Sequence, residues 1–179
     1  MSDALVRNAV EEDFHTIQSI YAKEVLEGSA SFETEPPSID VLLERFRAIQ
    51  NAALPYFVAT VDGSVAGYGY AGPYRPRYAY RFTVENSVYV HPDYRRVGIA
   101  SQLLDQLIEA CCDGEWQQMI AVIGDSRNAS SIALHRRCGF RMVGVLEAVG
   151  YKHNRWIDTV LMQRSLQRPE PQRVSATRR

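Results

Sequence analysis

The sequence has few long apolar runs, few cysteines and no excess charge of either sign, and each shortage excludes a class of protein. Apolar stretches such as residues 119–123 are only a few residues long, so no segment is long enough to span a bilayer as a helix. Lys and Arg together number 20 and Asp and Glu 21, which argues against a nucleic-acid binder that works through a whole-domain positive field. Charged residues interrupt the first 13 positions, which therefore hold no apolar signal core. We expect a soluble, cytoplasmic protein that binds neither membrane nor nucleic acid.

The three cysteines are Cys111, Cys112 and Cys138, and their spacing forms no Cys-x-x-Cys pair for zinc or redox chemistry. Two adjacent cysteines cannot easily bridge each other. We interpret all three as free, buried thiols at helix ends and expect no metal site.

What is present is an ordinary globular composition, with 179 residues of which 46% are hydrophobic and 23% charged. This length suits one domain, which we place at residues 1–166. Residues 167–179 are rich in proline, arginine and small polar side chains, and we expect them to form a disordered basic tail.

Hydrophobic periodicity predicts an α/β protein with a mixed sheet. Apolar residues at helical spacing predict three helices, which begin near Asp13, after the N-cap candidate Ser38 and after Gly98. A fourth, short helix is predicted to end before Gly139. Asp62-Gly63 is a strong hairpin signal between two strands. The strands are expected at residues 4–10, 56–61, 64–71, 82–90, 119–123, 141–149 and 156–163.

Gly67, Gly69 and Gly72 spell the G-x-G-x-x-G pattern of dinucleotide sites, but in the wrong context. That site requires the glycines to open a helix, whereas these lie in a strand and are followed by Pro73 and Pro76. We interpret the glycines as places where the sheet bends or a neighbour approaches closely.

The segment from Val90 to Ser101 has the context that the glycine pattern lacks, because a strand ends, a loop turns and a helix begins. Gly98 and Ala100 leave little side chain in the way of amides that could surround an anion at the helix N-terminus. Arg95 and Arg96 add positive charge, and the Ser101 hydroxyl is a further donor. On physical grounds alone, a phosphate site and an ordinary basic loop are about equally supported.

Two motifs resemble the GCN5-related N-acetyltransferase (GNAT) superfamily. Arg95-x-x-Gly98-x-Ala100 after a strand is similar to its acetyl-coenzyme A pyrophosphate loop, and residues 128–140 resemble its second signature, an asparagine before a short helix that ends in Gly-Phe. His135 stands where many members have a tyrosine. That histidine, with residues 32–36, 71–75, 80–90 and 151–158, resembles the phosphinothricin and methionine sulfone or sulfoximine acetyltransferase branch.

The resemblance implies the GNAT fold, a central mixed twisted β-sheet flanked by about four helices, with acetyl-CoA as cosubstrate and no metal. It further implies a homodimer, a small amino acid analogue as acceptor and a role in antibiotic or herbicide resistance. The residues that it assigns to the cofactor are Val88, Tyr89, Val90, Arg95, Arg96, Val97, Gly98, Ile99, Ala100, Ser101, Asn128 and Ser131. Those that it assigns to the substrate are Phe32, Arg75, Arg77 and Lys152, with Glu85 and His135 as catalytic residues.

Acetyl transfer to an amine needs a group that removes the amine proton, because an α-amino group is largely protonated at pH 7. Glu85 lies in an apolar-flanked strand where burial could raise its pKa, although it could also be a surface carboxylate paired with Arg81. His135 could accept a proton or orient a water as neutral imidazole, or protonate the thiolate as imidazolium.

Three functions remain open at this stage. The first is acetylation of a small acidic amino acid analogue, which the arginines of residues 75–77 favour. The second is acetylation of another amine, such as a protein N-terminus, a polyamine or a xenobiotic. The third is a non-catalytic acyl-CoA sensor, which could retain the phosphate loop without Glu85 and His135, so the presence of both residues argues against it.

Overall fold

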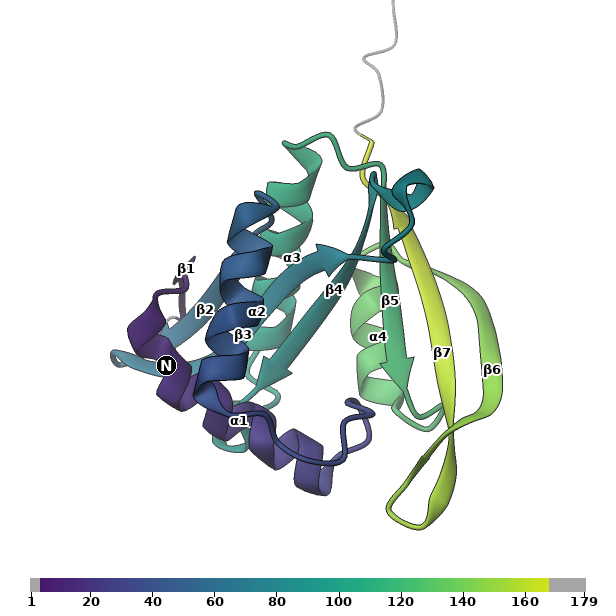
Figure 1. Ribbon diagram of the computed structural model, residues 1–179, viewed down its shortest axis with the longest axis horizontal. Coiled ribbons are helices and arrows are strands. Elements are labelled where there is room, and N and C mark those ends of the chain that lie inside the picture. Colours follow the sequence, from purple (N-terminus) through teal and green to yellow (C-terminus); the bar gives the residue numbers. More distant parts are fainter. Residues whose placement is uncertain (1–3, 168–179) are drawn as a thin grey trace, which may run out of the picture.

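The computed structural model describes residues 4–167, so the predicted tail lies outside the described residues from position 168 onward. One seven-stranded sheet in the order β1-β2-β3-β4-β5-β7-β6 carries helices on both faces (Figure 1). The strands are β1 Leu5–Asn8, β2 Tyr56–Val61, β3 Ser64–Pro73, β4 Thr83–Val90, β5 Gln118–Gly124, β6 Arg141–Lys152 and β7 Arg155–Ser165. The α-helices are α1 Phe14–Glu27, α2 Ile39–Asn51, α3 Ile99–Cys112 and α4 Ala129–Arg137.

The predicted mixed sheet with four α-helices is confirmed, since β4 and β5 pair in parallel and the other neighbours are antiparallel. Two details differ from the prediction. The strand expected to end at residue 149 continues to Lys152, because Gly150–Lys152 still pair with β7. A short 3-10 helix, Tyr78–Tyr80, occupies the loop before β4.

The two faces of the sheet are covered by different helices. Tyr68, Tyr70 and Tyr89 point to the face under α1 and α2, where the ring of Tyr21 from α1 meets Tyr89 edge-on at 5.1 Å. On the other face α3 lies so close to β3 that a Cβ on Gly69 would sit 3.1 Å from Leu107 Cδ1. A Cβ on Gly67 would likewise lie 3.2 Å from Ile99 Cγ2, so the interpretation as packing positions is confirmed for Gly67 and Gly69. It is wrong for Gly72, where a Cβ would meet nothing within 4 Å.

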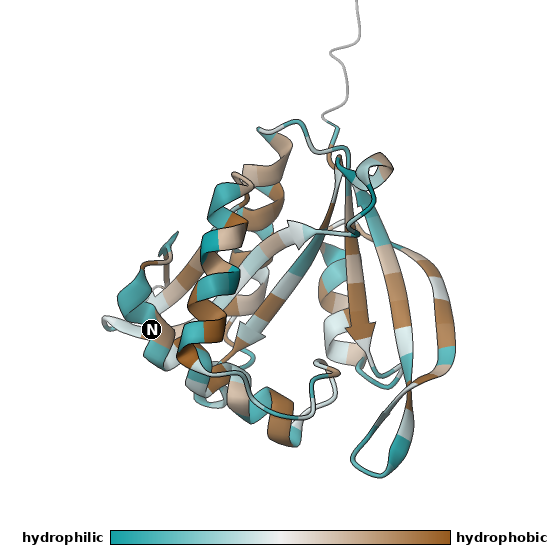
Figure 2. Cartoon of the chain, in the orientation of Figure 1, coloured by the Kyte–Doolittle hydropathy of each residue, from teal (hydrophilic) through white to brown (hydrophobic). Residues whose placement is uncertain are grey.

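Burial of an apolar stripe fixes α3 on the sheet. Leu103, Leu104 and Leu107 are fully buried, and each contributes about 1.5–3 kcal/mol relative to an exposed position. Cys111 is also buried in this stripe, and burial raises the pKa of its thiol to about 12, so it is an inert packing residue. The prediction of buried thiols is confirmed for Cys111 and Cys138 and is wrong for Cys112, which is only half-buried. Figure 2 shows brown, apolar segments along the central strands and teal residues on the outer sides of the helices.

The fold positions the site by separating two strands. β4 and β5 pair only from Thr83 opposite Gln118 to Asn86 opposite Ala121. Beyond that point β4 remains paired with β3 as far as Val90, and β5 with β7 as far as Gly124. The facing edges of β4 and β5 therefore diverge like a fork, as Figure 1 shows, and their backbone groups are not paired with each other.

Candidate active site

The space between the diverging strands is a cleft of about 1150 Å³ that passes through the sheet. Residues of α1 and the loop after it, from Ile20 to Ala30, line it on one face. The starts of α3 and α4 line it on the other face. Typical small-molecule sites measure about 300–1,000 Å³, so this cleft suits a long ligand with a second molecule beside it.

The start of α3 is a turn at the edge of the cleft whose geometry suits an anion. Gly98 caps the helix with φ at +94°, and a Cβ there would meet nothing within 4 Å, so backbone conformation and not space requires the glycine. Arg96 also has a positive φ of 66°. The amides of Ser101 and Gln102 donate to the Gly98 carbonyl at 3.0 and 3.1 Å, which leaves the amides before them at the exposed helix start.

Asn128 fixes the start of α4 at the opposite wall. Its Oδ1 accepts a hydrogen bond from the Ser131 amide at 3.2 Å and from the Ser130 hydroxyl at 3.1 Å. Such N-caps typically stabilise a helix by about 1 kcal/mol. The predicted signature asparagine therefore lines the cleft and also holds α4, the helix that carries His135.

His135 lies buried at the point where the strands separate. Its Nε2 lies 3.0 Å from Asn86 Oδ1, and its Nδ1 lies 2.8 Å from the Ser131 carbonyl. The Asn86 amide group in turn donates to the Ile120 carbonyl across the last β4–β5 pair, at 3.1 Å. Burial lowers the pKa of His135, and the hydrogen bond to Ser131 opposes this effect only partly. Burial thus favours the neutral imidazole, which can donate to only one of the two acceptor oxygens that face its ring nitrogens.

Glu85 points to the opposite face from His135, because neighbouring residues of a strand alternate. It pairs with Gly72 of β3 and shares the face of Ser87 and Tyr89 under α1 and α2. Burial raises the pKa of this carboxyl group, and the nearby positive charge of Arg75 opposes the rise. The structure thus supports the predicted environment, but the charge near Glu85 comes from Arg75. Arg81, the alternative partner, instead stacks over the Tyr78 and Phe82 rings.

The structure brings the predicted cofactor residues together and leaves the predicted substrate residues apart. Apart from Val97, every residue predicted to bind the cofactor lines the cleft, as does His135. Arg75 and Arg77 are exposed in the loop before β4. Arg75 lies near Glu85, and its guanidinium is 5.0 Å from the centre of the Tyr74 ring.

Lys152 differs most from its predicted role in recognising the substrate acid. Its side chain is 95% buried outside the cleft, its Nζ donates to the Ser31 carbonyl at 2.7 Å, and burial lowers its pKa. A lysine that donates to a loop carbonyl holds that loop in place and is not available to an acidic substrate. Phe32 belongs to the same loop and is 41% exposed.

Sequence reasoning missed several residues that line the cleft. Asn86 was not singled out, although a buried amide next to a candidate base in an apolar strand was a usable signal. The edge of β5 and the end of α1 gave no such signal, because their role depends on where the strands separate. The missed lining residues include Glu24, Gly28, Ala30, Ser87, Ala121, Val122, Ile123 and Gly124.

Within residues 4–167 no three His, Cys, Asp or Glu side chains are grouped so that they could hold a metal ion. In the same part of the chain, no helix is both long enough and apolar enough to cross a membrane.

Comparison with known proteins places this geometry in a family. Residues 6–161 match the family model of the acetyltransferase (GNAT) domain. The chain is 50% identical over 161 residues to a phosphinothricin N-acetyltransferase of Alcaligenes faecalis, covering 90% of this chain and 82% of that protein. It is 38% identical to an L-methionine sulfoximine/L-methionine sulfone acetyltransferase of Pseudomonas paraeruginosa, covering 91% of this chain and 95% of that protein.

A solved structure agrees with these matches. A GNAT superfamily phosphinothricin acetyltransferase from Sinorhizobium meliloti, crystallised in complex with acetyl-CoA, superimposes with a TM-score of 0.90 at 45% identity, covering 93% of this chain and 90% of that one. The resemblance seen in the two motifs is confirmed, and the chain belongs to the GNAT family of acetyltransferases.

Proposed function

We propose that this enzyme transfers the acetyl group of acetyl-CoA to the α-amino group of a small amino acid analogue, such as phosphinothricin or methionine sulfoximine or sulfone. One observation carries the proposal: the cleft passes through the sheet, with the turn at Gly98 on one face. Glu85 does not line the cleft itself but directly precedes the lining residues Asn86 and Ser87, with its side chain on the opposite face. A long phosphorylated cosubstrate can thereby enter from the α3–α4 face while the acceptor approaches from the α1–α2 face. The names of the relatives supply the substrate class.

The amides around Gly98 and the Ser101 hydroxyl hold the pyrophosphate in this proposal, with Arg95 and Arg96 adding positive charge. The free edge of β4 at Val88–Val90 pairs with the amide groups of the pantetheine arm, as a neighbouring strand would. An amide of the same edge is then available as a donor to the oxyanion that forms when the amine attacks the thioester.

Glu85 removes the proton from the attacking amine, directly or through one water. The raised pKa of Glu85 lies closer to the pKa of the amine, which favours proton transfer near neutral pH. His135 lies on the α3–α4 face, where we place the thiol of coenzyme A. As neutral imidazole it accepts a proton or orients a polar group there. The two catalytic candidates thus act on opposite faces of one strand.

Arg75 and Arg77 recognise the acidic group of the acceptor. Guanidinium groups match carboxylate and phosphinate oxygens in bidentate geometry, and both arginines are exposed on the loop before β4. Arg75 acts electrostatically on Glu85, so an acid bound there lies close to the proposed base. A polyamine would be repelled by the same charges.

Incubation of the purified protein with acetyl-CoA and a panel of amines tests the proposal, with thiol release and product mass as readouts. The panel contains phosphinothricin, methionine sulfoximine, a polyamine and a peptide with a free N-terminus. We expect turnover with the first two and the acetylated amino acid as product. Turnover of the peptide alone would assign a protein acceptor, and binding of acetyl-CoA without turnover of any amine would favour a sensor.

We further propose that the protein is a cytoplasmic homodimer that joins through β6, and that a single domain of residues 1–166 carries the activity. β6 is the outer strand of the sheet and exposes apolar side chains along its length, namely Met142, Val143, Val145, Leu146, Val149 and Tyr151. An exposed apolar edge of this length promotes association, and a second copy of the same strand is a self-complementary partner. Acetylation of phosphinothricin by such an enzyme would confer resistance.

Light scattering during size exclusion tests the dimer. Val143→Glu combined with Val145→Glu should convert a dimer into a monomer, because charges would face charges across a two-fold axis. Leu5→Glu is the matched control, since Leu5 is 64% exposed on β1 at the opposite edge of the sheet. A wild-type monomer would contradict the proposal.

A further inference from the structure

Residues 28–32, here called the 28–32 loop, connect the acceptor face of the cleft to the far end of the sheet. Gly28 and Ala30 line the cleft at the end of α1. The next residues pass the end of β5, as the loop after α1 does in Figure 1, and Phe32 packs against Gly150 of β6. The position of this wall of the cleft is therefore set by elements more than 90 residues away in the sequence.

The main chain of the 28–32 loop is held by donors from the β6–β7 hairpin. His153 Nε2 lies 2.9 Å from the Gly28 carbonyl, and Lys152 Nζ donates to the Ser31 carbonyl at 2.7 Å. Because a loop has no ladder to satisfy its carbonyl groups, such donors decide its position. The lysine that sequence reasoning assigned to the substrate is one of these anchors.

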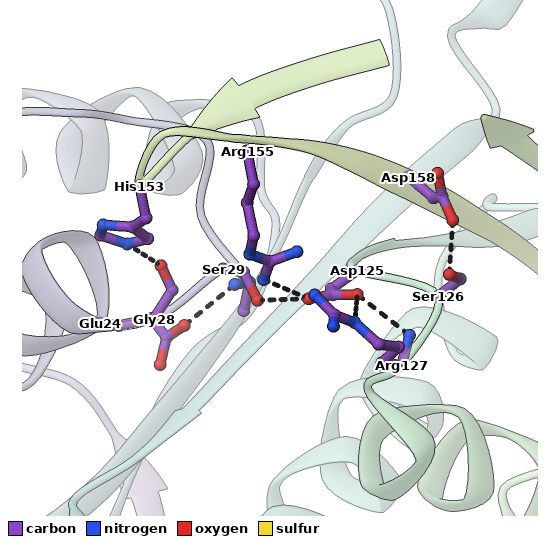
Figure 3. Close-up of polar contacts among 10 residues, drawn as sticks. Glu24, Gly28, Ser29, Asp125, Ser126, Arg127, His153, Arg155 and Asp158 are labelled. Carbon is purple, nitrogen blue, oxygen red and sulfur yellow. Dashed lines mark hydrogen bonds and ion pairs between the residues drawn. The ribbon is translucent and has the colours of Figure 1, made fainter. Parts of the chain in front are cut away.

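The β5–α4 loop holds the same segment through Asp125. The Ser29 hydroxyl donates to the Asp125 carboxylate at 3.4 Å, and Arg155 donates to the same oxygen at 2.5 Å. The Arg127 amide donates to the other carboxylate oxygen at 3.1 Å. Figure 3 shows these side chains converging on Asp125, with His153 beside Gly28. The 28–32 loop is thus fixed at several points.

Phe32 ends the loop with its ring against two glycines. A Cβ on Gly150 would lie 2.3 Å from Phe32 Cε2, and a Cβ on Gly124 would lie 3.1 Å from Phe32 Cε1 and 2.1 Å from the Ser29 carbonyl oxygen. Neither glycine has a positive φ, so space and not backbone conformation requires glycine at both positions. Any larger residue would displace the ring from the sheet.

Gly124 faces the side of the sheet on which we place the acceptor. It lies two residues from Val122, which is 38% exposed, and four from Ile120, which pairs with Glu85. At a rise of about 3.3 Å per residue, Phe32 therefore lies roughly 13 Å along the sheet from Glu85. This interval suits a small amino acid together with the thioester.

We propose that Gly124 and Gly150 are specificity-determining residues that act through Phe32. By holding the Phe32 ring against the sheet, they fix the 28–32 loop, whose Gly28 and Ala30 line the cleft. They thereby set the far wall of the space in which the acceptor lies, and the size of amine that is acetylated. Lys152 is a positioning residue that keeps the 28–32 loop on this seat. The inference rests on the proposed function and adds the structural basis of its selectivity.

Gly150→Ala tests the seat, with Gly144→Ala as the matched control. Both glycines lie in β6, and a Cβ on Gly144 would meet nothing within 4 Å. In Gly150→Ala we expect kcat/KM for phosphinothricin to fall by about 10-fold to 10²-fold, because the wall of the acceptor space moves. The Kd for acetyl-CoA, measured by calorimetry, should stay unchanged, and Gly144→Ala should match wild type in both quantities.

Phe32→Ala supplies the complementary measurement and does not depend on how Gly150→Ala folds. It should raise kcat/KM for bulky α-amino acids relative to phosphinothricin, and in Gly150→Ala it should restore part of the lost activity. The same ratio of acceptors in Phe32→Ala and wild type would overturn the inference, as would equal kinetics of Gly150→Ala and Gly144→Ala. If wild type acetylates no amine, the proposed function itself fails, which is a distinct result.

Discussion

The two sides of the cleft are built differently. The cofactor side depends on backbone features within single segments: a left-handed glycine at Gly98, an N-cap at Asn128 and a free strand edge at Val88–Val90. The proposed acceptor side is assembled from distant segments, since Glu85 lies in β4, Arg75 in the loop before it and Phe32 in the 28–32 loop. The cofactor side could therefore serve many acyl-CoA-dependent reactions without change. Small displacements of the segments on the acceptor side would change which acceptor fits.

The largest expected effect is on the chemical step at Glu85. Glu85→Gln keeps the shape of the side chain but removes the proton acceptor, so kcat should fall by about 10²-fold to 10⁴-fold while the Kd for acetyl-CoA stays unchanged. Glu12→Gln, an exposed carboxylate on the surface, is the control. Steady-state kinetics with unchanged kcat in Glu85→Gln would mean that water alone removes the proton.

The pH profile gives the same residue a second readout. Burial raises the pKa of Glu85 and Arg75 opposes the rise, so kcat/KM in wild type should increase as pH rises through that raised pKa. Arg75→Ala removes a positive charge that favours the carboxylate, and the acidic limb should therefore move to higher pH. A limb that stays in place would show that another group controls it.

The next largest effect is expected on acetyl-CoA binding when the turn at Gly98 is changed, with no change in acceptor preference. Gly98→Asp places a carboxylate beside the phosphates and forces a side chain at a φ of +94°. We expect the Kd for acetyl-CoA to rise by roughly 10-fold to 10²-fold. Gly72→Ala, where a Cβ also meets nothing within 4 Å but φ is not positive, is the control. Wild-type affinity in a folded Gly98→Asp protein would remove the phosphate assignment.

A smaller effect, on the acceptor and not on acetyl-CoA, is expected when Arg75 and Arg77 are replaced. Arg75→Ala with Arg77→Ala should raise KM for phosphinothricin by about 10-fold, since the charge-assisted hydrogen bonds to its acid are lost and exposure limits their strength. KM for acetyl-CoA should change little. Equal KM values for the acceptor in variant and wild type would show that its acid is recognised elsewhere.

The smallest expected effect is on stability and concerns Asp125. Burial raises the pKa of this carboxyl group, but hydrogen bonds from Arg155 and Arg127 lower it to about 2. A depressed folded pKa stabilises the fold above the unfolded value near 4, and this contribution is lost as pH falls toward 2. Asp125→Asn should therefore lose at most about 2 kcal/mol at pH 7 and depend less on pH between 4 and 2. Urea unfolding of Asp125→Asn and of the exposed control Glu44→Gln measures the difference.

The contrast between the two sides also explains what the sequence could predict. The turn at Gly98 and the cap at Asn128 are local, so a strand end, a small residue and a helix start were enough to find them. Lys152 was assigned to the substrate through the family resemblance, whereas the fold buries it against Ser31, 121 residues away. Nothing in the order of residues shows where β4 and β5 separate or that α1 ends beside this fork, and the missed residues lie in these two places.

A crystal structure of the enzyme with coenzyme A and phosphinothricin tests the central claim most directly, because it shows on which face of the sheet each ligand lies. We predict pyrophosphate oxygens within hydrogen-bond distance of the amides at residues 98–100 and of the Ser101 hydroxyl. The acceptor amino group should lie on the α1–α2 face, within reach of Glu85 directly or through one water. An amino group on the α3–α4 face beside His135, or a pyrophosphate away from Gly98, would contradict this account.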